Sequence, residues 1–421
     1  MDTKPLWEKE REGYPSFPKL PLDAEVDVAI VGGGITGLLC AYLLRKEGKE
    51  VIVLEADTLV SGATHQTTAF LTEIIDTNQT DLIDVFGLKA ARDVRKSHAA
   101  AINLIEDIIK KEKIDCEFIR CSNYIIASDS EQAELIEEEF DALRRAGVKV
   151  KSVRADELGI RAVQALEVPN QAKFHPTKFL HGMIAALVRM EVPLYEHSKV
   201  KELIDKDDGT QELVVGRRSV RALWTLRSTY HPFDNPKAVL LKKGMYVTYL
   251  MELSAPQGLY QEGIYEDLDN PYRYFRVDAR ETHDRIIIGG EDHRVEFKMN
   301  PEKNFAALEA YGKQIFGRKH KVVRRWTGPI LEPIDGLALI GEVAPRALIA
   351  TAFSGNGMTY AGIAALMSRD LVVGRDNPWL ELYDPTRMPT MRQLWKKGRD
   401  YTEEFFNGAV ANALQREGTP S

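Results

Sequence analysis

The glycine-rich stretch that begins at residue 32 constrains the fold of this chain more than any other feature. Residues 26–31 (VDVAIV) form a short apolar run typical of a buried strand, and Gly-Gly-Gly-Ile-Thr-Gly follows at residues 32–37. Residues 38–46 have helical composition, Gly48 ends that helix, and residues 51–55 (VIVLE) form a second apolar run. The pattern predicts one βαβ unit with a tight turn before its helix.

The residue types in this unit suit a dinucleotide. Gly32 allows the sharp turn, Gly34 lets backbone N–H groups approach a pyrophosphate, and Gly37 lets the helix pack against the strand. Glu55 follows Gly37 by 18 residues and ends the second strand. A carboxylate there can bind both hydroxyls of an adenosine ribose and disfavours a 2′-phosphate. The sequence therefore predicts binding of a dinucleotide other than NADP.

The composition excludes several function classes. The chain has 421 residues, 44% hydrophobic and 28% charged, which is typical of a globular protein of two or three domains. Its net charge of −7 supplies no basic face for nucleic acid. Residues 28–44 carry no charge, but their glycines favour strand, turn and helix over a membrane span. Three cysteines without metal-site spacing and an N-terminus without a signal sequence lead us to expect a cytoplasmic protein with no metal.

Two further segments resemble parts of a known family. Residues 61–69 (SGATHQTTA) form a small, hydroxyl-rich segment just after the ribose acid. Near the C-terminus the chain reads RWTG at 325–328, PIDG at 333–336, a strand-like LIATA at 348–352 and FSGNGMT at 353–359, followed by an apolar helix. In this order the segments resemble FAD-dependent oxidoreductases of the D-amino-acid oxidase type, which include glycine oxidase and sarcosine oxidase.

The resemblance spans residues 26 to about 385 and implies FAD as the cofactor. It also implies an α/β fold with a Rossmann-like FAD-binding domain, interleaved with an α+β substrate domain built on an antiparallel sheet. The amides that begin the helix after residue 357 suit the flavin pyrimidine, where negative charge develops on reduction. The implied cofactor contacts are Gly32, Gly34, Ile35, Thr36, Gly37, Glu55, Ala56, Ser61, Gly62, Thr67, Thr68, Ala69, Val200, Gly328, Gly355, Asn356, Gly357, Met358 and Thr359.

The tail resembles one branch of this family more closely. Residues 377–379 (NPW) and 383–387 (YDPTR) look most like the branch whose members often carry a C-terminal Rieske domain. A Rieske centre needs two cysteines and two histidines, and no cysteine follows Cys121. We therefore expect this chain to lack that domain, as a shorter or truncated homologue. Because Cys40, Cys116 and Cys121 all precede the C-terminal signature that carries a covalent flavin in some members, we expect noncovalent FAD.

The middle of the chain predicts the remaining elements. Helices are expected at residues 81–113 and 131–145 and from Pro176 onward, strands at 117–127 and 195–203, and an antiparallel sheet at 242–298. The expected division is an N-terminal extension at 1–25, an FAD-binding domain at 26–80, 150–240 and 325–375, a substrate domain at 81–149 and 241–324, and a helical tail at 376–421.

One segment departs from the family pattern. Members have a strand ending in Ala-Thr shortly before the substrate sheet, whereas residues 215–231 here read VGRRSVRALWTLRSTYH, with four arginines. Local divergence, a misplaced alignment and a local sequence error such as a frame shift all remain open explanations.

The expected chemistry is removal of a hydride from the C–N bond of an amine or N-substituted amino acid, with oxygen or a redox partner as the electron acceptor. An arginine that binds the substrate carboxylate in the amino-acid oxidases is replaced here by Ile330, which makes a simple amino acid doubtful. The catalytic candidates are His65, Tyr274 and Arg276. The alternatives are a non-catalytic flavoprotein subunit and a dehydrogenase that passes electrons to a separate protein.

Overall fold

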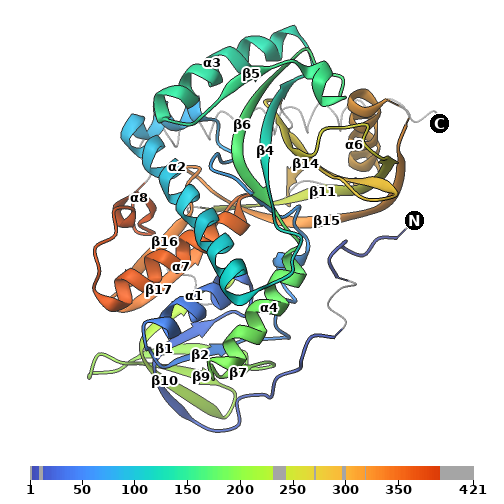
Figure 1. Ribbon diagram of the computed structural model, residues 1–421. Coiled ribbons are helices and arrows are strands. Elements are labelled where there is room, and N and C mark those ends of the chain that lie inside the picture. The colour runs from blue at the N-terminus through green and yellow to red at the C-terminus, as the bar shows by residue number, and fades with distance from the viewer. Residues whose placement is uncertain are drawn as a thin grey trace, which may run out of the picture.

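A computed structural model describes residues 2–8, 13–230, 243–269, 272–295, 300–317 and 319–388. The chain forms two lobes, each organised around one sheet, and it passes between them several times (Figure 1). The described helices are α1 (Ile35–Lys46), α2 (Gln79–Glu112), α3 (Ser130–Ala146), α4 (Pro176–Arg189), α6 (Pro301–Phe316), α7 (Gly357–Val373) and α8 (Leu380–Tyr383), with 3-10 turns η2 (Ala63–His65) and η3 (Ala155–Leu158).

The lobe at the bottom of Figure 1 contains the predicted βαβ unit in a mainly parallel sheet. Its strands follow the order β16-β17-β10-β1-β2-β7. In addition, β9 pairs antiparallel with β10, and β8 pairs with β9. Apolar strand residues are buried on both faces, and α1 packs against α4 and α7. The bounds are β1 (Ala24–Val31), β2 (Val51–Leu54), β7 (Leu194–Tyr195), β8 (Glu202–Asp205), β9 (Gln211–Val215), β10 (Arg218–Arg227), β16 (Leu339–Ala344) and β17 (Ala347–Thr351).

The segment that departed from the family pattern contains strand β10. It pairs in parallel with β1, from Ala24↔Val220 to Val31↔Arg227, and with β17 on its other side. The expected buried strand is therefore present. Three of the four arginines are exposed because they lie at or before the outer half of the strand, whereas Arg227 is buried at its inner end. His231 lies outside the described residues.

The upper lobe contains a nine-stranded sheet in the order β15-β11-β14-β13-β12-β4-β6-β3, with β5 beside β6. All its pairs are antiparallel except β12 with β4, so the antiparallel sheet predicted for residues 242–298 is confirmed. The bounds are β3 (Phe70–Leu71), β4 (Ile119–Ala127), β5 (Lys151–Val153), β6 (Gln164–Lys173), β11 (Lys243–Pro256), β12 (Gly263–Asp267), β13 (Arg273–Asp278), β14 (His283–Arg294) and β15 (Lys321–Pro333).

The sheet membership of four strands differs from the expected domain limits. β3, β5 and β6, and most of β15, fall in ranges that we assigned to the FAD-binding domain, yet all four pair within the nine-stranded sheet. The reason is that β6 lies antiparallel to β4 and β15 lies antiparallel to β11, and such long-range pairing leaves no local signal in the sequence.

The two ends of the described chain pack on this body. Trp7 is fully buried, so residues 2–8 are part of the folded structure rather than a free extension. At the other end Arg387 donates to both carboxylate oxygens of Asp335, at 2.7 and 2.8 Å. The expected helical tail is described as far as residue 388, and the helix in that part is α8.

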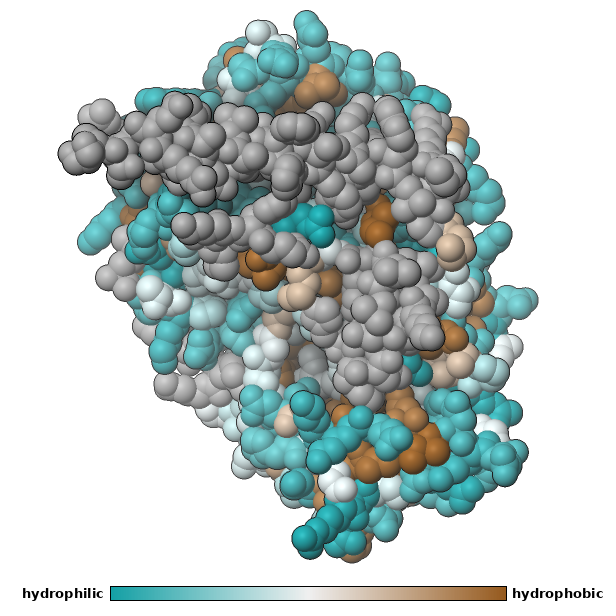
Figure 2. Space-filling model, turned by 180° about the vertical axis from the view of Figure 1, so that it is seen from behind, coloured by the Kyte–Doolittle hydropathy of each residue, from teal (hydrophilic) through white to brown (hydrophobic). Residues whose placement is uncertain are grey.

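The face shown in Figure 2 is mostly polar where it is not grey. Its largest apolar patch lies toward the bottom of the view, and smaller apolar patches lie elsewhere on the same face. None of the helices in the described ranges combines the length and the apolar character needed to cross a membrane.

Candidate functional site

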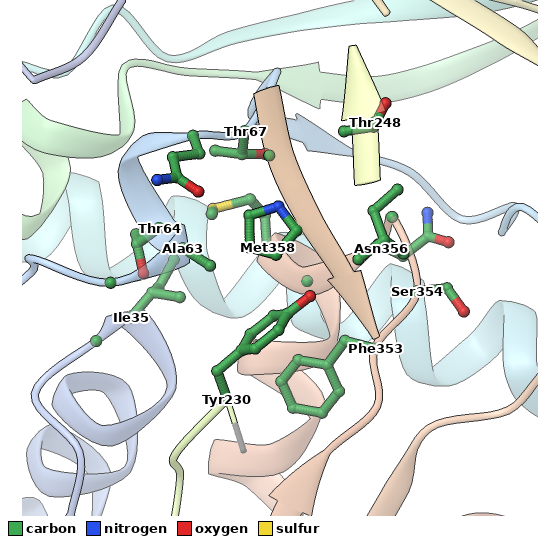
Figure 3. A pocket seen from close by; sticks show the side chains of 18 of the residues that line it. Ile35, Ala63, Thr64, Thr67, Tyr230, Thr248, Phe353, Ser354, Asn356 and Met358 are labelled. Carbon is green, nitrogen blue, oxygen red and sulfur yellow. The ribbon is translucent and has the colours of Figure 1, made fainter. Parts of the chain in front are cut away.

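A cavity of about 570 Å³ lies between the two sheets and has a size typical of ligand sites. One wall comes from the β1–α1 turn, the segment after β2 and the turn between β17 and α7. The other wall comes from β11, β12, β13, β14 and β15. In the close view of Figure 3, Thr64 and Thr67 lie on one side, Asn356 and Ser354 on the other, and the Tyr230 ring points into the space between them.

The β1–α1 turn places backbone groups at this cavity. Gly32 has φ +113°, and a Cβ there would lie 2.8 Å from the Ser228 carbonyl oxygen. A Cβ on Gly37 would lie 2.0 Å from the Gly32 carbonyl oxygen, so these two glycines are required by the fold itself. Gly34 differs, because it lines the cavity and a Cβ there would come within 3.3 Å of Thr64 only. A side chain at Gly34 would therefore intrude on a ligand more than on the protein.

Two helices begin at the cavity without a side-chain cap. The N-cap of α1 is Gly34, which has no side chain, and the N-cap of α7 is Asn356, whose side chain accepts no bond from its helix. The first amides of both helices are therefore available to a ligand, and the positive ends of both helix dipoles favour anionic groups. A Cβ on Gly357 would meet nothing within 4 Å, so the wall at α7 leaves room for close approach.

Glu55 lies at the cavity with its carboxylate held in place by backbone groups. Its Oε2 accepts a hydrogen bond from the Gly33 N–H at 2.7 Å, and its Oε1 accepts one from the Asp57 N–H at 2.9 Å. A carboxylate has about four acceptor positions, so this one can still accept from two hydroxyls. The turn, the two helix ends and Glu55 together fit the pyrophosphate and the ribose of a flavin dinucleotide and the flavin pyrimidine, on which negative charge develops when the ring is reduced.

The segment after β2 is fixed from its outer side. Trp7 Nε1 donates to the Thr67 carbonyl oxygen at 2.6 Å, and Arg276 Nη1 donates to the Thr68 carbonyl oxygen at 2.8 Å. Ala69 has φ +59° and is fully buried. These contacts leave the side chains of Thr67 and Thr68 lining the cavity.

The structure brings most of the expected cofactor contacts together. Those that line the cavity are Gly32, Gly34, Ile35, Thr36, Glu55, Ser61, Gly62, Thr67, Thr68, Gly328, Gly355, Asn356, Gly357 and Met358. Gly37, Ala56, Ala69, Val200 and Thr359 do not line it. Thr359 is fully buried, and its Oγ1 accepts a bond from the Thr72 N–H at 3.3 Å.

Of the three catalytic candidates, only Tyr274 lines the cavity. Its hydroxyl lies 3.0 Å from Thr248 Oγ1, and burial raises its pKa well above the ordinary value. His65 is buried in η2 and does not line the cavity. Arg276 shares a face with Tyr274 but is buried under the segment after β2. Tyr274 is therefore the one of the three that stays a candidate by its position at the cavity, whereas His65 and Arg276 lie behind the wall.

Sequence reasoning missed the carboxyl groups on the sheet side of the cavity. Asp76, Glu266 and Asp292 line it, and Glu332 does so as well. Burial is the main cause that raises the pKa of Asp76 to about 6, of Glu266 to about 7 and of Asp292 to about 8. Mutual repulsion adds to this, since Asp76 acts on both Glu266 and Asp292. The only sequence signal was that three of these acids, Glu266, Asp292 and Glu332, lie near the ends of three separate strands. Sheet topology alone brings those strand ends together.

A mainly parallel sheet with a phosphate-binding turn, next to an antiparallel sheet across a large cavity, defines a two-domain dinucleotide-dependent enzyme. Residues 27–371 match the family described as DAO, FAD dependent oxidoreductase. The chain belongs to this family of FAD-dependent oxidoreductases, and FAD is its cofactor.

Similar proteins extend over nearly the whole chain. YhfW of Bacillus subtilis (strain 168), named as a Rieske 2Fe-2S iron–sulfur protein, is 27% identical over 96% of this chain and 80% of its own length. Gamma-glutamylputrescine oxidoreductase of Escherichia coli is 23% identical over 86% of this chain and 87% of its own. Glycine oxidase from Geobacillus kaustophilus has the same fold, with a TM-score of 0.73 and 19% identity over 87% of this chain and 99% of its own.

Proposed function

We propose that this enzyme oxidises the C–N bond of an amine or N-substituted amino acid. The observation that supports this most directly is that one continuous cavity joins the phosphate-binding turn and the two helix ends to a wall of tyrosines and carboxyl groups from the other sheet. The similarity to proteins named glycine oxidase and gamma-glutamylputrescine oxidoreductase agrees with an amine or amino-acid donor.

When bound, the cofactor would serve as the acceptor of a hydride, and so of two electrons, from the carbon that carries the nitrogen. The substrate is left as an iminium, which water converts to a carbonyl compound and a free amine, and the two electrons pass to oxygen or to a separate redox protein. The chain's own part is to bind and orient. Amides at the starts of α1 and α7 hold negative charge, Glu55 holds the ribose, and the wall formed by Tyr274 and its neighbours positions the donor.

Anaerobic titration of the purified holoenzyme tests the proposal. Amines and N-substituted amino acids are added in turn, and the flavin absorbance near 450 nm is followed. We expect at least one donor to bleach the flavin and to yield a carbonyl product. If none of the donors in a broad panel reduces the flavin, the protein uses FAD without amine oxidation and the proposal is wrong.

The electron acceptor is tested on the same reduced enzyme. Mixing it with air-saturated buffer gives the rate at which oxygen restores the flavin absorbance. Reoxidation as fast as turnover identifies an oxidase. Reoxidation much slower than turnover with an artificial acceptor identifies a dehydrogenase that needs a separate partner.

A further inference from the structure

Residues 67–69 pass along the cavity close to the antiparallel sheet. Just before them, a Cβ on Gly328 of β15 would come within 3.2 Å of the Gln66 carbonyl oxygen. Just after them, the Phe70 ring packs edge-on against the Tyr274 ring, with ring centroids 5.9 Å apart. These three residues therefore lie where the lobe with the phosphate-binding turn meets the sheet that carries Tyr274.

The Arg276 side chain holds the backbone of this segment from outside the cavity. Its Nη1 atom lies within hydrogen-bond distance of three carbonyl oxygens, those of Thr68 at 2.8 Å, Phe174 at 3.1 Å and Ala69 at 3.3 Å. The side chain is buried, so water competes little for these bonds. The guanidinium group therefore fixes the direction of the peptide group between Thr68 and Ala69.

The direction of that peptide group determines what the Thr67 hydroxyl can do. In a trans peptide the C=O and N–H bonds point in opposite directions, so the Ala69 N–H points away from Arg276. It donates to Thr67 Oγ1 at 3.0 Å. A hydroxyl that accepts this bond still has its own hydrogen to donate, and Thr67 lines the cavity (Figure 3). A chain of bonds thus runs from a buried cation, through one peptide group, to a donor at the cavity.

The backbone at Ala69 shows that the segment is constrained. Ala69 has φ +59° and is fully buried. A residue with a Cβ keeps a left-handed conformation only when its surroundings impose it, and such residues are concentrated at functional sites. The bonds from Arg276 to the carbonyl groups of Thr68 and Ala69 lie on both sides of this residue and supply that constraint.

Asp278 in turn holds Arg276 in place. Arg276 Nε lies 2.8 Å from Asp278 Oδ1, and the same carboxylate pairs with Lys173 Nζ at 2.6 Å and Arg285 Nη2 at 2.7 Å. Burial alone would raise the pKa of Asp278, but the three cations hold it well below its ordinary value. Asp278 therefore stays ionised and anchors the guanidinium group.

We propose that Arg276 is a positioning residue for FAD, which holds residues 67–69 so that the Thr67 hydroxyl donates a hydrogen bond to the bound flavin. The guanidinium charge polarises the peptide group and the hydroxyl in series and so strengthens this donor. Because negative charge develops on the flavin when it is reduced, the donor stabilises the reduced form more than the oxidised form. This inference goes beyond the proposed function, since it does not depend on which compound is oxidised.

The reduction potential of the bound flavin tests the proposal. It is measured on the holoprotein by equilibration with a dye of known potential, with no amine present. We expect Arg276→Met to lower the equilibrium ratio of reduced to oxidised flavin at least about tenfold, a potential about 30 mV more negative for a two-electron couple. Arg276→Lys keeps the charge without the planar fork, so its shift should be smaller. An unchanged potential in Arg276→Met overturns the proposal.

Arg285→Met is the matched control. Each of the two methionine variants removes one cation from Asp278 and one guanidinium group from beside the Trp7 ring. Among the described residues, however, Arg285 makes no hydrogen bond to residues 67–69. We expect Arg285→Met to change the flavin ratio by less than about threefold. Equal shifts in the two variants would be an effect of the ion cluster in general and would contradict the positioning role.

Thr67→Val tests the path from Arg276 to the flavin and leaves the buried cations intact, so it also serves if Arg276→Met does not fold. It removes the hydroxyl and should itself lower the flavin ratio at least about tenfold, whereas Thr67→Ser, which keeps the hydroxyl, should match the parent protein. In the Thr67→Val background, Arg276→Met should add less than about threefold. A parent-like potential in Thr67→Val, or full additivity of the two changes, contradicts the proposal.

The proposed reaction and this inference fail separately. If no amine reduces the flavin but Arg276→Met and Thr67→Val shift the potential as expected, the positioning role stands and the reaction is wrong. If an amine reduces the flavin and neither variant shifts the potential, the reaction stands and the positioning role is wrong. Flavin absorbance and thermal unfolding of each variant show that the measured protein is folded and holds FAD.

Discussion

We expect Glu55 to act on cofactor binding in two ways. It can accept hydrogen bonds from the hydroxyls of a ribose. Its two oxygens also accept hydrogen bonds from the Gly33 and Asp57 amides, and these bonds shape the turn that faces the phosphates. Glu55→Ala removes both roles, whereas Glu55→Gln keeps one acceptor oxygen and loses the charge.

We therefore expect FAD affinity to fall at least about tenfold in Glu55→Ala and by an intermediate factor in Glu55→Gln. FAD dissociation followed by fluorescence in one buffer measures the series. The control is Asp57→Ala, because only the backbone N–H of Asp57 takes part. Equal affinities across the series would show that Glu55 is an acid at a strand end with no role in binding.

Gly34 and Gly37 should respond differently to an added side chain. In Gly34→Val the new atoms enter the cavity, so flavin occupancy should be lost while the protein without flavin keeps its melting temperature within roughly 2 °C. In Gly37→Ala the Cβ would meet the Gly32 carbonyl, so the fold itself should be destabilised, by roughly 1–3 kcal/mol. Flavin absorbance and thermal unfolding distinguish the two effects, and flavin retained in Gly34→Val would contradict the binding role of the turn.

At the scale of elements, the N-terminal segment supports the segment after β2. Trp7 packs edge-on against His175, with ring centroids 4.5 Å apart, and its Nε1 donates to the Thr67 carbonyl. The guanidinium groups of Arg276 and Arg285 lie 5.7 and 5.0 Å from the Trp7 ring centre. Residues 2–8 therefore act on the cavity from outside it.

Trp7→Phe keeps most of the buried ring and removes the bond to Thr67. We expect about 1 kcal/mol of lost stability and FAD affinity lowered several-fold, because the segment that carries Thr67 and Thr68 is held less firmly. Tyr14→Phe is the matched control, since it also removes one bond to a backbone carbonyl, that of Thr177, but does not contact this segment. A control that lowers FAD affinity as much as Trp7→Phe would contradict a specific role of Trp7.

At the scale of the whole molecule, the cavity acids make stability depend on pH. The pKa of Asp292 is raised to about 8 and that of Glu266 to about 7, above the unfolded values near 4. The folded protein therefore binds more protons than the unfolded chain, and the stability that this provides is lost as the pH rises through 7 and 8. His98 and His175, with pKa values lowered to about 4 by burial, act in the opposite direction below about pH 6.5.

Between pH 7 and 9 the histidine effect is nearly complete, so the acids dominate. We expect the melting temperature of the protein without added amine to fall by roughly a few degrees over this range, and to fall less in Asp292→Asn. Thermal unfolding at several pH values measures both effects, and identical pH profiles for the variant and the parent protein would contradict the raised pKa of Asp292.

The sequence by itself determined the first βαβ unit, the second glycine turn before α7 and the cofactor that they bind. These features are local, because a strand, a turn and a helix follow one another within about 25 residues in each unit. The same local signals predicted α2, α3, β4 and the antiparallel character of residues 242–298.

Only the tertiary structure decided which residues face the cavity together. β10 was obscured by arginines that its outer half exposes, and β6 and β15 joined the larger sheet through partners far along the chain. Arg276 and Tyr274 share a strand face, yet one supports the backbone beside the cavity and the other lines it. Asp76 and Asp292 are 216 residues apart, with Glu266 between them, and no local pattern links the three, because long-range strand pairing alone sets which side chains meet.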